Sequence, residues 1–110
     1  MNAVQFFKCL SDETRLNSTL LIHQEGETCV CELMEALGDS QPKISRHLSQ
    51  LRSWGILTDR RQEQWVFYSI HPNLPDWALT ILNTVGQAHK KELLSLKKKL
   101  KAMKDRPNRC

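Results

Sequence analysis

Several features that would define other protein classes are missing from this sequence of 110 residues. It has no run of about 18 apolar residues, so we expect no transmembrane helix. The N-terminus, MNAVQFFKCLSDE, lacks the charged, apolar and small-residue order of a signal peptide. We find neither an internal repeat nor a low-complexity linker. These absences predict a cytoplasmic protein with one domain, residues 1–104, followed by a short flexible tail, residues 105–110.

Positive charge is unevenly distributed along the chain. The formal net charge is +4, but residues 90–110 contribute +7, so residues 1–89 sum to −3. Within that acidic part, residues 40–61 carry five Lys or Arg and one acidic residue, Asp59. Clustered basic charge predicts phosphate contacts better than the net charge does. The lysine-rich end, KKELLSLKKKLKAMK, also carries a leucine stripe, which favours a helix with a solvated lysine face over a membrane-binding tail.

Apolar spacing and capping signals predict a mainly helical fold with one small β-hairpin. Helices are expected over residues 3–10, from an N-cap at Ser11 to about residue 24, from an N-cap at Thr28 to residue 37, and from an N-cap at Ser40 to residue 54. Two strands, 56–61 and 65–70, enclose a polar tip. One long helix is expected from Asp76 to about Met103. Two helices followed by such a hairpin are typical of the winged helix-turn-helix fold.

The last predicted helix has an apolar stripe that a small domain cannot easily cover by itself. Its members recur at spacings of three and four residues or their sums: Leu82, Val85, Leu93, Leu96, Leu100 and Met103. A second copy of the chain is the simplest cover. We therefore predict a homodimer formed through the first and last helices.

Two of the four cysteines, Cys29 and Cys31, are separated by one residue. With Thr28 as N-cap they would occupy the first and third helical positions, where free N–H groups and the helix dipole favour a thiolate. Soft metal and metalloid ions prefer thiolate sulfur. Positions two apart lie about 200° around a helix, so holding one ion between them predicts unwinding of that turn. The alternative is a pair of small core residues.

The helix predicted after Ser40 resembles a DNA recognition helix, which contacts bases from its N-terminal part. The candidates for DNA contact on this helix are Ser40, Gln41, Lys43, Ser45, Arg46 and His47. Arg46 and His47 can reach phosphates or guanine edges. In the hairpin, Arg60 and Arg61 are predicted to hold the DNA backbone. The alternative is a solvated charged face without a ligand.

Four segments resemble the ArsR/SmtB family of metal-responsive repressors, in particular its arsenic-sensing branch. They are LSDETRL at residues 10–16, CVCEL at 29–33, SQPKISRHLSQLRSWGIL at 40–57 and RRQEQWVFYSI at 60–70. The resemblance implies a homodimer that occupies operator DNA and leaves it when arsenite or antimonite, As(III) or Sb(III), binds to Cys29 and Cys31. The branch often has a third cysteine where Met34 stands, so Cys9 or Cys110 is considered as a third ligand. Cys9 follows an apolar run, which favours a packing role.

Other interpretations of these residues remain open. His89 and Glu92, with Asp76 thirteen residues before His89, resemble the zinc site of other family members, although an interface histidine is favoured. Cys29 and Cys31 also suit a thiol redox sensor on the same winged helix-turn-helix fold. A thiol-disulfide oxidoreductase is the alternative from another class, and it would leave the DNA-binding helix unexplained. The favoured hypothesis is a repressor and not an enzyme.

Overall fold

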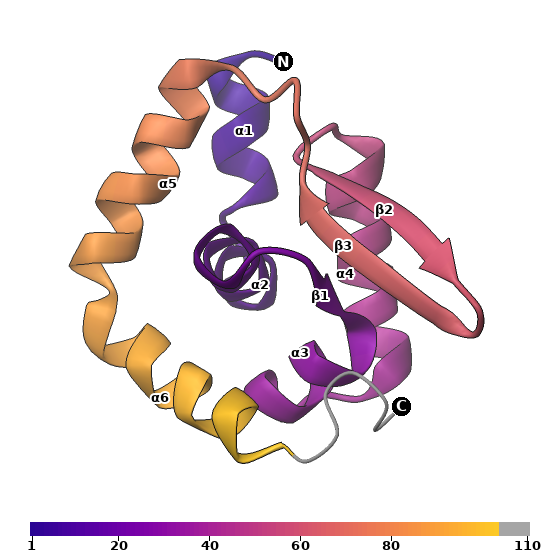
Figure 1. Ribbon diagram of the computed structural model, residues 1–110. Helices are drawn as coiled ribbons and strands as arrows, with labels where there is room; N and C mark the ends of the chain where they lie inside the picture. The colour runs from indigo at the N-terminus through magenta and orange to yellow at the C-terminus, as the bar shows by residue number, and fades with distance from the viewer. Residues whose placement is uncertain (104–110) are drawn as a thin grey trace.

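Helix α2 (Glu13–Glu25) lies at the centre of the fold, and the other elements surround it (Figure 1). The computed structural model describes residues 1–103. The remaining elements are α1 (Ala3–Cys9), β1 (Thr28–Cys29), α3 (Val30–Leu37), α4 (Gln41–Ser53), β2 (Leu57–Gln62), β3 (Trp65–Ile70), α5 (Asp76–Ala88) and α6 (Lys90–Ala102). The prediction of a mainly helical fold with a small hairpin is confirmed.

The helix starts follow from local capping chemistry. Ser40 is the N-cap of α4, as predicted, and its hydroxyl accepts a hydrogen bond from the backbone N–H of Lys43 at 3.4 Å. The N-cap of α2 is Asp12 and not Ser11, because the Asp12 carboxylate accepts from the N–H of Arg15 at 3.0 Å. The hydroxyl of Ser11 donates instead to the carbonyl of Lys8 at 2.8 Å.

Strand β1 was not predicted, and it changes the position of the cysteine pair. Thr28 pairs with Tyr68 and Cys29 pairs with Phe67, so these two residues extend the hairpin sheet. The prediction of Thr28 as the cap of α3 is wrong, because its hydroxyl donates to the carbonyl of Gly26 at 2.8 Å and its backbone belongs to the strand. Cys29 is the N-cap, with an extended backbone at φ −90° and ψ 164°.

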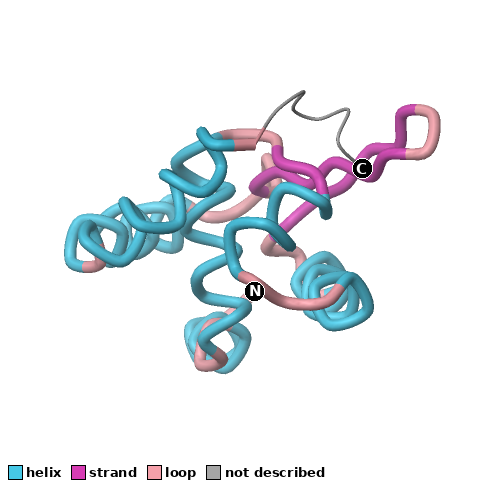
Figure 2. The backbone as a smooth tube through the Cα atoms, turned by 90° about the horizontal axis from the view of Figure 1, so that it is seen from below, coloured by secondary structure: helices cyan, strands magenta, loops and turns pink. Residues whose placement is uncertain are grey.

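The three strands form one antiparallel sheet in the order β1-β3-β2. Strands β2 and β3 continue beyond the short β1 as a hairpin that projects past α4 (Figures 1 and 2). Glu63 at the tip adopts φ 57°, as a tight hairpin turn requires. The hairpin is therefore a wing whose base includes the first residue of the cysteine pair.

The predicted helix from Asp76 to Met103 is divided into α5 and α6. The chain bends at His89, which has φ −100° and ψ 26° (Figure 1). The bend brings α6 against α2 and α3, where Leu93, Leu100 and Met103 are buried. The argument that this stripe requires a second subunit is therefore wrong, because the chain itself covers most of it. No helix within residues 1–103 has both the length and the apolar composition needed to cross a bilayer.

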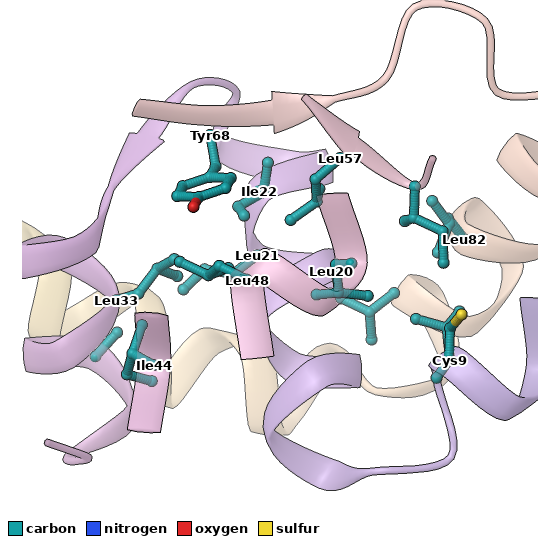
Figure 3. Close-up of a cluster of buried hydrophobic side chains, with 14 of the residues drawn as sticks. Cys9, Leu20, Leu21, Ile22, Leu33, Ile44, Leu48, Leu57, Tyr68 and Leu82 are labelled. Carbon is teal, nitrogen blue, oxygen red and sulfur yellow. The ribbon is translucent and has the colours of Figure 1, made fainter. Parts of the chain in front are cut away.

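The hydrophobic core connects the DNA-binding elements to the rest of the domain (Figure 3). Ile44, Leu48 and Leu51 form the predicted buried stripe of α4, and they belong to the same cluster as Leu33 of α3 and Leu57 of β2. Ser18 and Thr19 of α2 are also buried, and the Thr19 hydroxyl is satisfied by the Arg15 carbonyl at 2.8 Å. Helices α3 and α4 and the wing therefore share one core.

Candidate DNA interface and sensor site

A polar cleft of about 370 Å³ lies between the start of α3, helix α4 and the wing. Cys29 and Cys31 both line it, so the structure brings the predicted sensor pair to the side of α4 that faces the wing. The other lining residues are Val30 of α3, Gln41, Ser45, Ser49 and Arg52 of α4, and Asp59, Arg61, Gln64, Trp65, Val66 and Tyr68 of the wing.

Cys29 is a buried thiol and not a stabilised thiolate. Its side chain is 1% exposed. Burial raises the pKa of the Cys29 thiol, and the nearby Glu32 carboxylate adds to the increase. Glu32 is itself buried and accepts the backbone N–H of Cys29 at 3.0 Å. The expectation that the helix N-terminus would lower the pKa of Cys29 is wrong, because the residue lies in the strand and desolvation dominates.

The remaining cysteines differ in their surroundings. Cys31 is the second residue of α3 and is half-buried. Cys9 is free, belongs to the hydrophobic core, and has a thiol pKa raised by burial. It does not line the cleft, which agrees with the predicted packing role. Cys110 lies outside the described residues. Among residues 1–103 no group of three or more His, Cys, Asp or Glu is arranged to hold a metal ion.

Most of the predicted DNA contacts are accessible and lie in the first turns of α4 and on the wing. Ser40, Gln41, Arg46 and Arg61 are exposed, whereas Lys43 and Ser45 are half-buried. The ammonium of Lys43 lies 3.0 Å from the carboxylate of Asp39, and the amide of Gln41 donates to the hydroxyl of Ser45 at 3.1 Å. These side chains leave a polar, partly basic surface along the first turns of α4.

His47 does not face outward as expected. It is 6% exposed and lies on the inner side of α4 beside α2. Its Nδ1 atom is 3.3 Å from Nη1 of Arg15, and its Nε2 atom is 3.9 Å from the carboxylate of Asp12. Gln50 is also half-buried and accepts from Arg15 at 3.2 Å. Burial therefore gives His47 no open edge for a base or a phosphate.

Arg60 is engaged by the protein itself. Its guanidinium forms a two-point ion pair with Glu27, with both N···O distances 2.7 Å, and it stacks over the ring of Phe67 at 4.8 Å. This pair holds the wing strand β2 to the residue before β1. The hydrogen bond from Arg60 lowers the pKa of Glu27. Arg61, by contrast, points into the cleft lining beside α4.

Sequence reasoning missed Arg15, Asp12 and Glu27 as partners of the DNA-binding elements. Arg15 and Asp12 lie in the LSDETRL segment, but a charged first turn of a helix predicts only capping and dipole effects. Glu27 is separated from Arg60 by 33 positions, and the pairing depends on the unpredicted strand β1. These contacts become visible only when the strand register is known.

The geometry of one chain does not support a zinc site formed by Asp76, His89 and Glu92. His89 Nδ1 lies 3.8 Å from Glu92. Asp76 is at the opposite end of α5, about 20 Å away along the helix axis at 1.5 Å per residue. The three residues therefore do not assemble within a single chain.

The support helix α3, the capped recognition helix α4 and the wing define a winged helix-turn-helix DNA-binding protein. A family model for bacterial regulatory proteins of the arsR family matches residues 12–59. The chain is 58% identical over 103 residues to the arsenic resistance transcriptional regulator ArsR2 of Pseudomonas putida, covering 94% of this chain and 90% of that protein. The chain belongs to the arsR family, and it is a transcriptional regulator and not an enzyme.

Two further proteins are similar to the chain. The arsenical resistance operon repressor of Escherichia coli K12 is 45% identical over 97 residues, which cover 88% of this chain and 83% of the repressor. The crystal structure of the antimony-specific transcriptional repressor AntR superposes with a TM-score of 0.67 at 26% identity, covering 80% of this chain and 77% of that one.

Proposed function

We propose that this protein is a transcriptional repressor that binds operator DNA as a homodimer in the bacterial cytoplasm and is released by arsenite or antimonite held by Cys29 and Cys31. The observation that carries the proposal is the shared cleft, in which both cysteines face residues of the recognition helix and the wing. The arsenic-resistance regulators and the antimony-specific repressor described above support the choice of ligand.

The donor set suits a trivalent arsenic or antimony centre. Thiolate sulfur is the preferred ligand for soft ions, and ligation requires the reduced form of Cys31. When As(OH)₃ binds, each S–H bond is replaced by an S–As bond, and the proton leaves with a hydroxide as water. No electron is transferred. With two protein sulfurs, the third arsenic position keeps its hydroxide.

The strand register supports a route from the cysteine pair to the wing. Cys29, Phe67 and Arg60 occupy one row across β1, β3 and β2. Because the Cys29 thiol is buried, drawing it toward Cys31 displaces β1 and strains its pairing with β3. Coupling of about 1–3 kcal/mol is enough for a typical allosteric ligand. The wing is therefore a second element that ligand binding would displace, besides the first turn of α3.

For operator contacts we propose Ser40, Gln41, Lys43, Ser45 and Arg46 of α4 together with Arg61 of the wing. All are exposed or half-buried, and Gln41, Ser45 and Arg61 line the cleft. Arg46, at the exposed side of α4, is the best placed to reach a phosphate or a guanine edge. Arg60 contributes by holding the wing to Glu27, and any contact of Arg60 with DNA requires that this pair opens.

For the homodimer we propose the exposed apolar patch on α1 and α5. Val4 and Phe7 of α1 and Trp77 of α5 are exposed. They lie together because the Trp77 ring packs edge-on against Phe6, with ring centroids 5.4 Å apart. Contiguous exposed aromatic side chains are typical of subunit interfaces. This surface keeps the predicted first helix and α5, the first part of the predicted last helix, and replaces the apolar stripe that continues into α6.

Operator release tests the proposal. Fluorescence anisotropy of a fluorescein-labelled duplex, selected by the wild-type protein from a random library, is followed in reducing buffer as arsenite or antimonite is added. We expect affinity to fall about 5- to 150-fold for the wild type, and Cys29→Ser and Cys31→Ser to bind the duplex without responding. Cys9→Ala is the matched control and should respond fully. If arsenite or antimonite still released either serine variant fully from the duplex, the assignment of Cys29 and Cys31 as ligands would be refuted.

A thiol redox sensor is the second candidate, because Cys29 and Cys31 line the same cleft as residues of α4 and the wing, so oxidation of either thiol would act at that place. The same assay separates the two functions when hydrogen peroxide replaces arsenite. Release by peroxide, with no response to arsenite in reducing buffer, would favour the redox sensor. Release by arsenite under reducing conditions would favour the arsenic sensor, because no oxidant is present.

A further inference from the structure

The side chain of Arg15, which reaches neither the cleft nor the wing, joins three helices. Its Nε atom donates to the carbonyl of Cys9 at the end of α1, at 2.7 Å. Its Nη1 atom donates to Gln50 of α4 at 3.2 Å and lies 3.3 Å from His47 Nδ1. The Arg15 guanidinium also lies 5.6 Å from the ring centre of Trp54, the C-cap of α4. The Arg15 side chain on α2 therefore contacts both the end of α1 and the second half of the recognition helix.

The side of α4 that Arg15 contacts is not the side that faces the wing. His47, Gln50 and Trp54 are spaced by three and four residues and form one stripe of the helix. The residues of α4 that line the cleft form a different stripe, Gln41, Ser45, Ser49 and Arg52. Positions 45 and 47 lie about 200° apart around the helix. Arg15 can therefore orient the cleft-lining stripe of α4, which includes the proposed DNA contacts Gln41 and Ser45.

Asp12 completes the arrangement from the start of α2. Its carboxylate accepts the backbone N–H of Arg15 at 3.0 Å and lies 3.9 Å from His47 Nε2. The N-terminal turn of α2 thus contacts both edges of a buried imidazole. Arg is better suited than Lys to such a site, because its planar fork reaches several acceptors in fixed directions.

We infer that Arg15 is a positioning residue for operator binding, which sets the rotation of α4 and ties it to α1. The inference rests on the proposed function, since it assumes that α4 enters the operator. It adds a route from the α1 surface, which carries Phe7 and Val4, to the recognition helix. A rigid anchor at the Cys9 carbonyl makes the position of α1 part of the DNA-binding geometry.

The salt dependence of DNA binding tests this role. In the anisotropy assay with the selected duplex, Arg15→Lys and Arg15→Gln should weaken binding about 10- to 100-fold, as expected for loss of one or two charge-assisted hydrogen bonds. The slope of log K against log salt should not change, because no phosphate contact is lost. Arg46→Gln is the comparison variant, and its slope should fall by about 0.9 for each phosphate contact removed.

A double-mutant cycle keeps the test independent of overall stability. Gln50→Ala removes an Arg15 partner on α4 and leaves the α1–α2 junction intact. Its effect on DNA affinity should not add to that of Arg15→Gln, whereas the effect of Arg61→Gln on the wing should add. Affinity within twofold of wild type for Arg15→Lys, a reduced salt slope for either Arg15 variant, or additivity with Gln50→Ala would overturn the inference. If the wild-type protein selects no duplex at all, the proposed function itself fails.

Discussion

Replacing Phe7 with Ser should convert the proposed homodimer into a monomer. Phe7 is 54% exposed on α1 and lies in the proposed dimer patch, with its ring edge-on to Phe6 at 5.8 Å between centroids. A Phe side chain has about 200 Å² of surface to bury, so about 100 Å² remains for a partner. At about 25 cal/mol per Å² this is about 2.5 kcal/mol. A two-fold axis doubles it to about 5 kcal/mol for the dimer.

This energy corresponds to a dimer dissociation constant about 10³- to 10⁴-fold weaker than that of the wild type. Sedimentation equilibrium over a series of protein concentrations measures it directly. The operator affinity of Phe7→Ser should fall with it, because one subunit then has to bind without the neighbouring half-site. Far-ultraviolet circular dichroism should stay unchanged, since Phe6 remains packed against Trp77.

Leu94→Ser provides the matched control for this prediction. Leu94 is 48% exposed on α6. Its replacement therefore removes a comparable exposed apolar side chain that lies outside the α1–α5 patch. The dimer constant of Leu94→Ser should remain that of the wild type. A wild-type constant for Phe7→Ser, or dissociation caused by Leu94→Ser alone, would refute the assignment of the dimer surface.

Two further predictions concern the stability of the DNA-binding elements. Leu48→Ala should lower the free energy of unfolding in urea by about 2–5 kcal/mol, because Leu48 is fully buried where α4 joins the core; a loss below about 1 kcal/mol would contradict this packing. The ion pair with Arg60 lowers the pKa of Glu27 from its usual 4.5. The pair therefore stabilises the fold above about pH 4.5, and this stabilisation is lost as the pH falls through the lower pKa of the folded state. Glu27→Gln should therefore flatten the acid side of a plot of urea midpoint against pH, and an unchanged slope would contradict the role of this ion pair.

Local signals in the sequence were enough to predict the elements that depend on neighbours in the chain. The Ser40 cap and the stripe Ile44, Leu48 and Leu51 specify α4, because capping and helical spacing act within a few residues. The hairpin strands are specified in the same way by β-branched and aromatic residues around a polar tip. These elements carry most of the proposed operator contacts.

Features that depend on distant partners were not predictable in this way. Thr28 has the side chain of a helix cap, yet pairing with Tyr68 places it in a strand. His47 has the side chain of a DNA contact, yet Arg15 and Asp12 hold it on the inner side of the helix. The stripe of α6 suggested a partner subunit because sequence spacing does not reveal the bend at His89. In each case a tertiary contact decided between two locally acceptable structures.

The position of Cys29 also sets how sensing and DNA binding compete. A cysteine pair held entirely within a helix would act through that helix alone, by unwinding its first turn. With Cys29 in β1, an ion proposed to bind both cysteines would disturb the cap of α3 and also the pairing of β1 with β3. Burial of the thiol opposes ligand entry, and on the proposed route a bound ion draws Cys29 away from its position in the native strand. In the proposed arsenic sensor, the free energy of As–S bonding would thereby be coupled to the wing as well as to α4.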